Sequence, residues 1–366
     1  MKMRHQAYYS FIYMAHKVIY HIFPARMTHL SPQLISAYYK SFKDYKQIFI
    51  VYGNGIGCEL YRQMSDAIDG VIYVSTTREI GNIVSKDKYI LLHSLIPDIC
   101  RYLFFHSYKN VSVVCWGSGI KLVTAKNYIL YPLKFILYHW FKYMITLMEP
   151  DKIYLQKKYF LKNIINQQYI GEREYELERY MGNRIKIENP SSLRTVFVGN
   201  NSSCINSYIA IAEKDLLSFK NDISLQFMLN YDYSKDAPSI VNLNKICELN
   251  YPTYSFNTQL YSLNEYASYI DRCDIYICGE DRQTGLAAIY TALRLGKKVF
   301  LSGNNYDWIT SLGCIVHHIS ELSKISSEEF LSRESDIVIQ NNFNVIANFE
   351  NVEKKIVAWN SIFALI

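Results

Sequence analysis

The stretch that decides the fold is "CGEDRQTGLAAIYTALRLGKKVFLSG", at residues 278–303. It leaves an apolar, strand-like run, passes through the polar residues Glu280 to Gln283, and becomes an apolar, helix-like segment that ends near Gly296. A second strand-like run follows at 297–303. Strand, short loop, helix and next strand form the repeating unit of a parallel α/β sheet. We therefore expect this stretch to lie inside a doubly wound domain.

The polar loop in this stretch has the composition of an anion-binding site. We expect the helix to begin near Thr284 or Gly285, and a helix N-terminus presents unpaired N–H groups that suit a phosphate. Arg282 adds a guanidinium that can pair with a diphosphate through two hydrogen bonds. Gln283 can bond a sugar or a phosphate oxygen. A capped helix start with a solvated, charged loop would explain the same residues without a ligand.

A second segment, "VFVGNNSSCINSYIAIA" at 196–212, repeats the pattern of strand, polar turn and helix. Gly199 allows the turn, and Asn200, Asn201 and Ser202 present small donors. The lysine of a nucleotide-hydrolysing P-loop is absent, so hydrolysis of a nucleoside triphosphate is not expected. The two loops together predict a diphosphate cradle at one edge of a sheet.

Other ligand motifs are missing from the sequence. "VYGNGIG" at 51–57 does not have the G-x-G-x-x-G spacing, and no acidic residue ends the next strand, so NAD or FAD is not expected. No Asp-x-Asp motif stands in a suitable loop. We therefore expect neither a metal nor a cofactor, and backbone N–H groups with Arg282 would have to meet the charge of a departing diphosphate.

The rest of the chain extends the α/β pattern in two series. Strands are predicted at 18–23, 47–53, 70–75, 89–94 and 111–117, and then at 194–199, 224–229, 253–257, 273–279, 297–303 and 313–318. Helices are predicted at 32–44, 55–68, 77–84, 96–107, 206–219, 239–249, 263–271 and 285–295. The charged segment 170–194 is interpreted as a linker. The predicted domains are an extension at 1–17, a first domain at 18–190, a second at 191–342 and a closing helix at 343–366.

The distribution of charge and the placement of the cysteines indicate the kind of surface that the protein meets and the compartment that holds it. Residues 1–190 hold 25 basic and 14 acidic residues, whereas 191–366 hold 14 and 19. A basic half beside an acidic half suggests that one face meets an anionic surface. The eight cysteines form no C-x-x-C pair and fall mostly in apolar runs, which suits a reducing compartment. No secretory signal pattern is evident, so we expect a cytoplasmic location.

The residues quoted above carry a family resemblance. "YASYIDRCDIYICGEDRQTG" at 266–285 and "LRLGKKVFLSGNNYDW" at 293–308 resemble the TDP-N-acetylfucosamine:lipid II N-acetylfucosaminyltransferases, also called 4-alpha-L-fucosyltransferases, which act in enterobacterial common antigen synthesis. The likeness covers about residues 18 to 366. Further matches are "VGN" at 198–200, Asn206, Tyr231, His93, "WG" at 116–117, "YPLK" at 131–134, Gly296, Asn305 and Trp308.

The resemblance implies a GT-B fold, in which two Rossmann-like, doubly wound domains face each other across an interdomain cleft. It implies transfer of a sugar from a TDP-, GDP- or UDP-linked donor to a polyprenyl-diphosphate-linked saccharide. The chain departs from the family at Gly119, where an acidic residue is usual, and at Thr284, where a second glutamine is usual. The implied donor contacts are Gly199, Asn200, Asn201, Ser202, Tyr231, Glu280, Arg282, Gln283, Thr284, Gly285 and Asn305; the implied acceptor contacts are Trp116, Gly117 and Ser118.

The acceptor side needs a base if the transfer inverts configuration. His93, after the fourth strand, is the first candidate and His29 the second, with Asp98 and Glu79 left open. The aromatic and basic stretch 127–150 reads either as a core helix or as a helix in the membrane interface, where Lys134, Trp140 and Lys142 would contact anionic lipid. With the basic N-terminal half, the membrane interpretation predicts a peripheral enzyme on the cytoplasmic face of the bacterial inner membrane. No nucleic acid partner is expected.

Two other functions fit the same residues. A nucleotide-sugar 2-epimerase shares the two-domain fold and acts on a soluble substrate without a lipid. A non-catalytic protein of this fold would bind a nucleotide sugar without turnover. The basic, aromatic N-terminal half favours the transferase over the epimerase, whereas only an assay of turnover separates the transferase from the non-catalytic protein.

Overall fold

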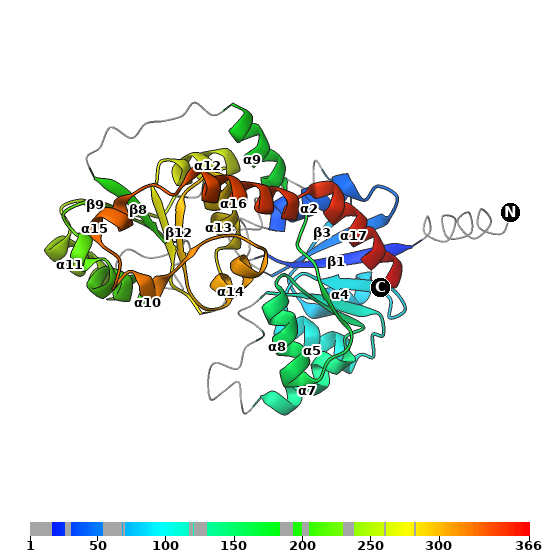
Figure 1. The fold of residues 1–366 in the computed structure, drawn as a ribbon. Coiled ribbons are helices and arrows are strands. Elements are labelled where there is room, and N and C mark those ends of the chain that lie inside the picture. Colours follow the sequence, from blue (N-terminus) through cyan, green and yellow to red (C-terminus); the bar gives the residue numbers. More distant parts are fainter. Residues whose placement is uncertain are drawn as a thin grey trace. The chain divides into compact units, whose positions relative to one another are not determined.

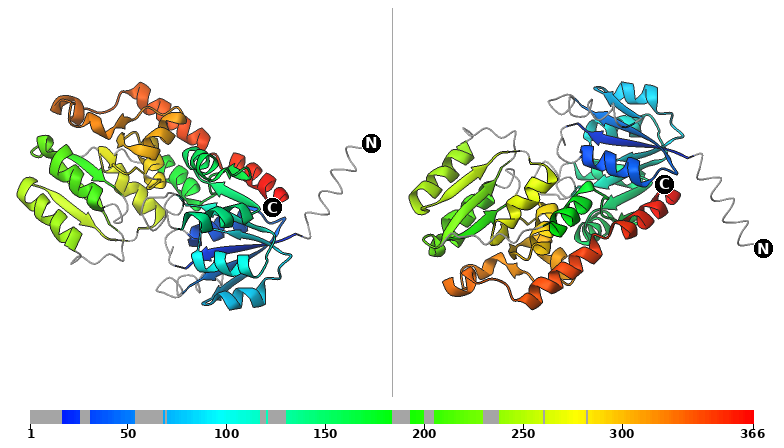
Figure 2. Two further views of the ribbon diagram at one scale, coloured as in Figure 1. Left: turned by 90° about the horizontal axis from the view of Figure 1, so that it is seen from below. Right: turned by 90° about the horizontal axis from the view of Figure 1, so that it is seen from above.

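The computed structural model describes residues 17–25, 31–53, 68, 70–116, 120, 130–183, 193–199, 205–229, 238–259, 261–281 and 283–366. These form two compact units, Met1–Glu172 with Val352–Ile366 (unit 1) and Arg173–Asn351 (unit 2). Each unit is built on one sheet of parallel strands with helices around it (Figures 1 and 2). The predicted α/β fold class is therefore confirmed.

The sheet of unit 1 has seven strands in the order β3-β2-β1-β4-β5-β6-β7, and all of the pairs are parallel. The five strands that the sequence predicted for this half are present, and two more follow them. The strands are β1 (Val18–Pro24), β2 (Lys46–Tyr52), β3 (Val71–Val74), β4 (Tyr89–Leu92), β5 (Val111–Cys115), β6 (Tyr143–Thr146) and β7 (Ile164–Asn166).

Helices cover both faces of this sheet, which explains its continuous apolar strands. One face packs on α2 (Ser31–Ser41) and on the last helix of the chain, α17 (Val352–Leu365). The other face packs on α4 (Thr77–Ile83), α5 (Pro97–Phe105), α7 (Tyr131–Trp140) and α8 (Glu149–Tyr159). The helix predicted at 55–68 lies almost wholly outside the described residues.

The sheet of unit 2 has six strands in the order β10-β9-β8-β11-β12-β13, again with parallel pairs. The strands are β8 (Arg194–Val198), β9 (Ile223–Met228), β10 (Tyr254–Asn257), β11 (Ile275–Cys278), β12 (Lys298–Leu301) and β13 (His317–His318). The helical segments are α9 (Glu172–Gly182), α10 (Ile205–Ala210), the π-helical turn η3 (Ile211–Asp215), the 3-10 turns η4 (Leu217–Phe219) and η5 (Ile319–Glu321), α11 (Pro238–Asn250), α12 (Leu263–Asp271), α13 (Leu286–Arg294), α14 (Gly303–Ser311), α15 (Ser327–Leu331) and α16 (Asp336–Phe349).

Two connecting regions differ from the prediction. The charged segment interpreted as a linker contains helix α9, because Glu178 pairs with the buried Arg294 at 2.6 Å and Tyr180 donates to Asp271 at 2.9 Å. The predicted closing helix is two helices, α16 in unit 2 and α17 in unit 1. The compact units thus divide at Glu172, before the predicted boundary at 190.

Candidate functional site

The order of strands marks one place in unit 2 where a ligand is expected. The chain builds β8, β9 and β10 toward one edge of the sheet and then returns to build β11, β12 and β13 toward the other. The order therefore reverses between β8 and β11. Doubly wound proteins bind ligands outside the carboxyl ends of the strands at this point. The two polar loops that the sequence singled out follow these two strands.

The loop after β11, residues 279–285, is held by three hydrogen bonds with two neighbouring helices, α10 and α14. The Ser207 hydroxyl of α10 donates to the carbonyl oxygen of Gly279 at 2.9 Å. The Asn305 side chain, which is fully buried on α14, donates from Nδ2 to the carbonyl oxygen of Thr284 at 2.8 Å. The Asn304 N–H donates to the Asp281 carbonyl oxygen at 3.3 Å. The loop is thereby fixed against the N-terminus of α14.

Gly303 makes this close approach possible. It has φ 51°, and a Cβ built on it would lie 2.9 Å from both the carbonyl carbon and the carbonyl oxygen of Asp281. Any larger residue at this position would push the loop away. Gly285, with φ 68°, makes the second tight turn of the loop, where α13 begins.

Two helix N-termini lie at this edge without a side-chain cap, although the Asn304 N–H of α14 is already bonded to the Asp281 carbonyl oxygen. Neither Gly285 before α13 nor Ser302 before α14 makes a side-chain capping bond, and both helices have nine residues. Three polar atoms beside them are buried and have no hydrogen-bond partner in the described part of the chain: Ser302 Oγ, Asn305 Oδ1 and Gln283 Oε1. The N–H groups suit phosphate oxygens, and the side-chain oxygens can accept hydrogen bonds from sugar hydroxyls.

Of the other predicted donor residues, the structure describes Gly199 and Glu280. The Gly199 N–H donates to the Ile277 carbonyl oxygen at 2.8 Å, which places the end of β8 beside β11. Glu280 is half-buried in the loop. Asn200, Asn201, Ser202, Tyr231 and Arg282 lie outside the described residues. Among the residues that are described, no group of three His, Cys, Asp or Glu side chains could hold a metal ion.

Unit 1 has its own reversal of strand order, between β1 and β4. Both predicted base candidates belong to the segments that follow these strands. His93 comes directly after β4, and its backbone N–H donates to the Ile22 carbonyl oxygen of β1 at 2.9 Å. His29 follows β1 but lies outside the described residues, as do Gly117 and Ser118. His93 thus lies at the switch point of this sheet.

His93 is fully buried and is part of a hydrogen-bonded chain of aromatic side chains. Its Nε2 lies 3.0 Å from Nδ1 of His21, and its Nδ1 lies 3.2 Å from the Tyr169 hydroxyl. The Trp116 indole N–H donates to the same hydroxyl at 3.0 Å. The His93 ring also stacks on Phe23, with centroids 3.8 Å apart. Burial lowers the pKa of His21 to about 3 and the pKa of His93 well below its usual value, so both rings are neutral.

Counting donors and acceptors shows in which direction the protons are donated along this chain of hydrogen bonds. The Tyr169 hydroxyl accepts from Trp116, and its own proton then has Nδ1 of His93 as acceptor, so Nε2–H of His93 donates to His21. This leaves one group without a partner, Nε2–H of His21. The reverse direction would leave two, the Tyr169 proton and the Nε2 lone pair of His21. Both nitrogens of His93 are thus engaged, and the role of His93 as a base stays a prediction that requires one of these bonds to open.

The predicted membrane residues do not share one helical face. Helix α7 ends at Trp140, and Phe141 is extended and buried because the chain enters strand β6 there. Lys142 therefore lies beyond the helix, with Nζ 5.3 Å from the Tyr89 ring. Trp140 is half-buried and donates to the Tyr108 carbonyl oxygen at 3.1 Å. Lys134 lies within α7, and burial lowers the pKa of its ammonium group.

Sequence reasoning missed several residues that shape these sites. His21 was one residue in a predicted strand, yet a histidine inside a strand buried on both faces signals a polar partner. Tyr169 lies 76 residues from His93 and gives no local signal. Ser207 and Ser302 look like ordinary turn and helix serines.

Searched over the same described segments, no helix is both long and apolar enough to cross a membrane.

No protein-family model matches the chain, and no curated protein matches it either. Solved structures match it over almost its whole length. A glycosyltransferase from Rickettsia africae ESF-5 aligns with a TM-score of 0.65 over 95% of this chain and 97% of its own, at 12% identity. An alpha,alpha-trehalose-phosphate synthase (UDP-forming) from Burkholderia vietnamiensis aligns with a TM-score of 0.65 over 96% and 100%, at 8% identity.

A trehalose-6-phosphate structure from E. coli, bound with UDP-2-fluoro glucose, aligns with a TM-score of 0.63 over 96% of this chain and 99% of its own, at 11% identity. Identities this low carry the fold and nothing finer. They agree with two parallel, doubly wound sheets in one chain. The protein has the α/β fold of the GT-B glycosyltransferases.

Proposed function

We propose that the protein is a glycosyltransferase that takes a sugar from a nucleotide diphosphate sugar. The observation that carries this proposal is the β8/β11 edge of unit 2. Uncapped N-termini of two helices and three buried, unpartnered oxygens lie beside one loop there. A diphosphate needs the first kind of group, and a sugar needs the second. The solved structures of this fold include one bound with UDP-2-fluoro glucose, which supports the same class of donor.

Each part of the site has a task in such a transfer. The transition state leaves negative charge on the departing diphosphate, and helix N–H groups with Arg282 would stabilise it. Asn305 would hold the loop through Thr284 and turn its free Oδ1 toward a hydroxyl of the donor. We expect these groups to meet the charge of the leaving group, so that the reaction proceeds without a metal ion.

The proposed acceptor is a polyprenyl-diphosphate-linked saccharide, and the proposed sugar is a deoxy or amino sugar such as N-acetylfucosamine or fucose. The family resemblance supports both. The excess of basic residues before residue 190 supports a peripheral position at the cytoplasmic face of the bacterial inner membrane, because such a surface is anionic. Bacterial surface polysaccharide synthesis is the process in which such an acceptor is elongated.

A panel of TDP-, GDP- and UDP-sugars, each with and without a polyprenyl-diphosphate-linked saccharide, tests the proposal. Sugar transfer that requires the lipid-linked acceptor supports it. Conversion of the free nucleotide sugar would instead show an epimerase, and binding without turnover would show a non-catalytic protein. Activity that is lost in EDTA and restored by magnesium would contradict the metal-free mechanism.

Arg282→Ala provides the sharper test of the donor site. We expect a loss in kcat/KM of about 10²-fold, equal to about 2.7 kcal/mol of transition-state stabilisation. Arg272→Ala is the matched control, because Arg272 is an exposed arginine at the end of α12 and away from the loop. Turnover of the Arg282 variant at the rate of the control would remove Arg282 from the mechanism.

A further inference from the structure

Helix α7 and its neighbours expose an unusual amount of apolar surface. Leu133 and Ile136 on α7 are 47% and 54% exposed, and Phe160, directly after α8, is 72% exposed. Phe105, the last residue of α5, is 71% exposed. Large apolar side chains that gather on one face mark an interaction surface more often than isolated ones do. We call these four residues the α7 face.

Contacts of their neighbours place these side chains around one helix. The Tyr159 ring lies between Tyr131 and Tyr138 of α7, with centroids 5.1 and 4.8 Å away, which brings Phe160 to one flank of the helix. On the other flank, the Phe104 ring packs edge-on against Trp140 at 5.5 Å, which brings Phe105 to that side. Figure 1 shows α5, α7 and α8 together on one side of unit 1.

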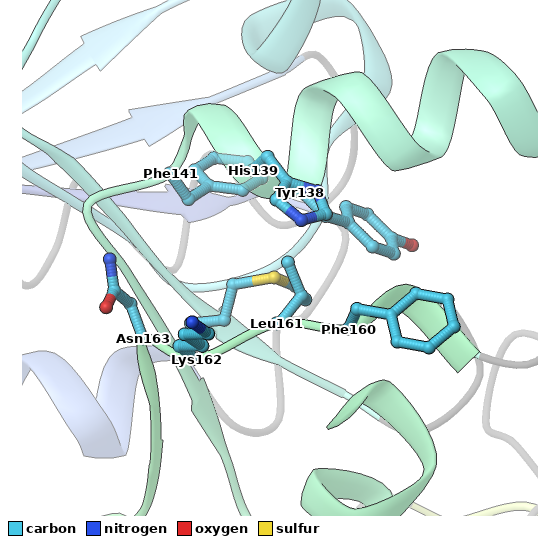
Figure 3. A pocket seen from close by; sticks show the side chains of 8 residues that line it. Tyr138, His139, Phe141, Phe160, Leu161, Lys162 and Asn163 are labelled. Carbon is cyan, nitrogen blue, oxygen red and sulfur yellow. The ribbon is translucent and has the colours of Figure 1, made fainter. Parts of the chain in front are cut away.

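A cavity of about 310 Å³ opens between α7 and the segment after α8 (Figure 3). Its inner wall includes Phe141 and Met144, which are almost fully buried, and its rim includes His139, Phe160 and Lys162. Ile136 lies one turn before His139 on the same side of α7. The apolar face and the cavity therefore form a continuous surface with an apolar interior and a lysine, Lys162, at its rim.

Phe160 occupies a backbone conformation that makes its exposure harder to explain by folding alone. It has φ 55° at the C-terminal end of α8, the left-handed position that glycine usually fills. A phenylalanine there costs conformational energy and gains little burial in return. Such a residue is better explained by a contact that the isolated protein lacks.

The charge around this surface is one-sided. Residues 131–163 contain six lysines and only two acidic residues, Glu149 and Asp151. Glu149 pairs with Lys152 at 2.9 Å, and Asp151 is fully buried. Lys158 and Lys162 are exposed beside the cavity and the start of α7. The accessible charge of this surface is therefore positive.

We propose that the α7 face and its cavity are where the protein docks on an anionic lipid surface. Ile136, Leu133 and Phe160 enter the apolar side of the interface, while Lys158 and Lys162 contact lipid phosphates. This inference rests on the proposed function in one respect, that the acceptor is held in a membrane. It changes the predicted contact, because Lys142 lies beyond the end of α7 and Trp140 is engaged in packing.

Vesicle sedimentation tests the proposal with the full chain and no sugar substrate. The wild type should bind vesicles of phosphatidylcholine with phosphatidylglycerol more tightly than phosphatidylcholine alone, and salt should weaken this binding. The double variant Ile136→Ser/Phe160→Ser should lose at least about tenfold in affinity for the anionic vesicles. The double variant Lys158→Glu/Lys162→Glu should lose a similar factor and its dependence on salt.

Matched changes in unit 2 serve as controls. Leu249→Ser/Ile337→Ser removes two side chains that are 73% and 81% exposed, and Lys245→Glu/Lys324→Glu reverses two exposed lysines. Both should bind vesicles like the wild type. Equal binding by the α7-face variants and the controls would overturn the proposal. So would a wild type that dimerises without lipid and becomes monomeric in Ile136→Ser/Phe160→Ser, because the face would then join two copies of the chain.

The test separates this proposal from the proposed function. Vesicle binding is measured without a nucleotide sugar, and transfer to a water-soluble acceptor analogue is measured without vesicles. Loss of the first with retention of the second in the α7-face variants supports both ideas. Normal vesicle binding by a protein that transfers no sugar would leave the docking surface in place and refute the transferase.

Discussion

Replacing Gly303 with alanine tests whether the loop at 279–285 is held in position by its contact with α14. Gly303 has φ 51° and lies directly against Asp281, the residue before Arg282. No substrate contact is removed by this change, because glycine has no side chain. Its effect on activity would therefore report the position of the loop rather than the loss of a functional group.

The magnitude follows from the distances. A Cβ on Gly303 would lie 2.9 Å from the Asp281 carbonyl carbon and oxygen, whereas ordinary contact begins at 3.4 Å. The loop must therefore move by at least about half an ångström, and further at the Asp281 Cα, which is closer still. A misplacement of about 1 Å at a reacting centre costs about 10²-fold in rate. We expect kcat/KM to fall by about 10- to 100-fold, with alanine in the left-handed region adding a stability cost of about 1 kcal/mol.

The assay compares sugar transfer and donor affinity in Gly303→Ala and Gly313→Ala. Gly313 also has a positive φ, 96°, but a Cβ there would meet only Val345 at 3.9 Å. The control thus carries the backbone strain without the collision. A folded Gly303→Ala protein with the kcat/KM of the Gly313 control would refute the idea that this contact positions the donor loop.

Three further predictions concern groups away from the donor loop. His317 donates to Glu334 and Glu321, and the bond to Glu334 raises the pKa of His317. The stabilisation of the fold by this raised pKa is full below the unfolded pKa of about 6.5 and is lost as pH rises through the folded pKa. The loss of unfolding free energy in His317→Gln, measured by urea unfolding, should therefore shrink with rising pH. ¹⁵N NMR of the wild type should show His93 protonated at Nε2, and Tyr169→Phe, which removes the donor to Nδ1, should change the Nδ1 shift; a wild-type ring protonated at Nδ1 would contradict the assigned direction. Trp359→Ala empties a fully buried site in α17 and should lower the unfolding free energy by about 3–5 kcal/mol in urea titrations.

The sequence predicted the strands well where a strand was apolar and bounded by turn residues. It failed at β6, where Tyr143–Thr146 continues an aromatic run with no Gly or Pro between it and α7, so that the stretch 127–150 read as one helix. It also failed at α9, whose exposed charges resemble a linker. The partners that fix this helix, Arg294 and Asp271, lie about 90 to 120 residues further along the chain, beyond the reach of any local pattern.

The arrangement of the β8/β11 edge was predictable because its parts are contiguous. Strand, polar loop, glycine and helix stand in order at 275–294, and parallel pairing brings Gly199, at the end of β8, beside β11. The details inside the loop were not predictable. That Asn305 would bond the Thr284 carbonyl, and that Gly303 would approach Asp281, depend on how α14 packs against the loop.

The histidine site of unit 1 could be located from the sequence, but the hydrogen bonds that decide its state could not be predicted. His93 was found because it ends a strand, but its state depends on His21, Tyr169 and Trp116, which come from three other parts of unit 1. Tyr169 in turn stacks on Trp359 of α17, so the last helix of the chain supports the histidine pair. A base that is bonded at both nitrogens cannot accept a proton until this arrangement opens. If His93 is the base, then binding of the acceptor must break one of these two bonds, and the Tyr169 hydroxyl, with Trp116 as its second partner, is the group that can leave while keeping a hydrogen bond.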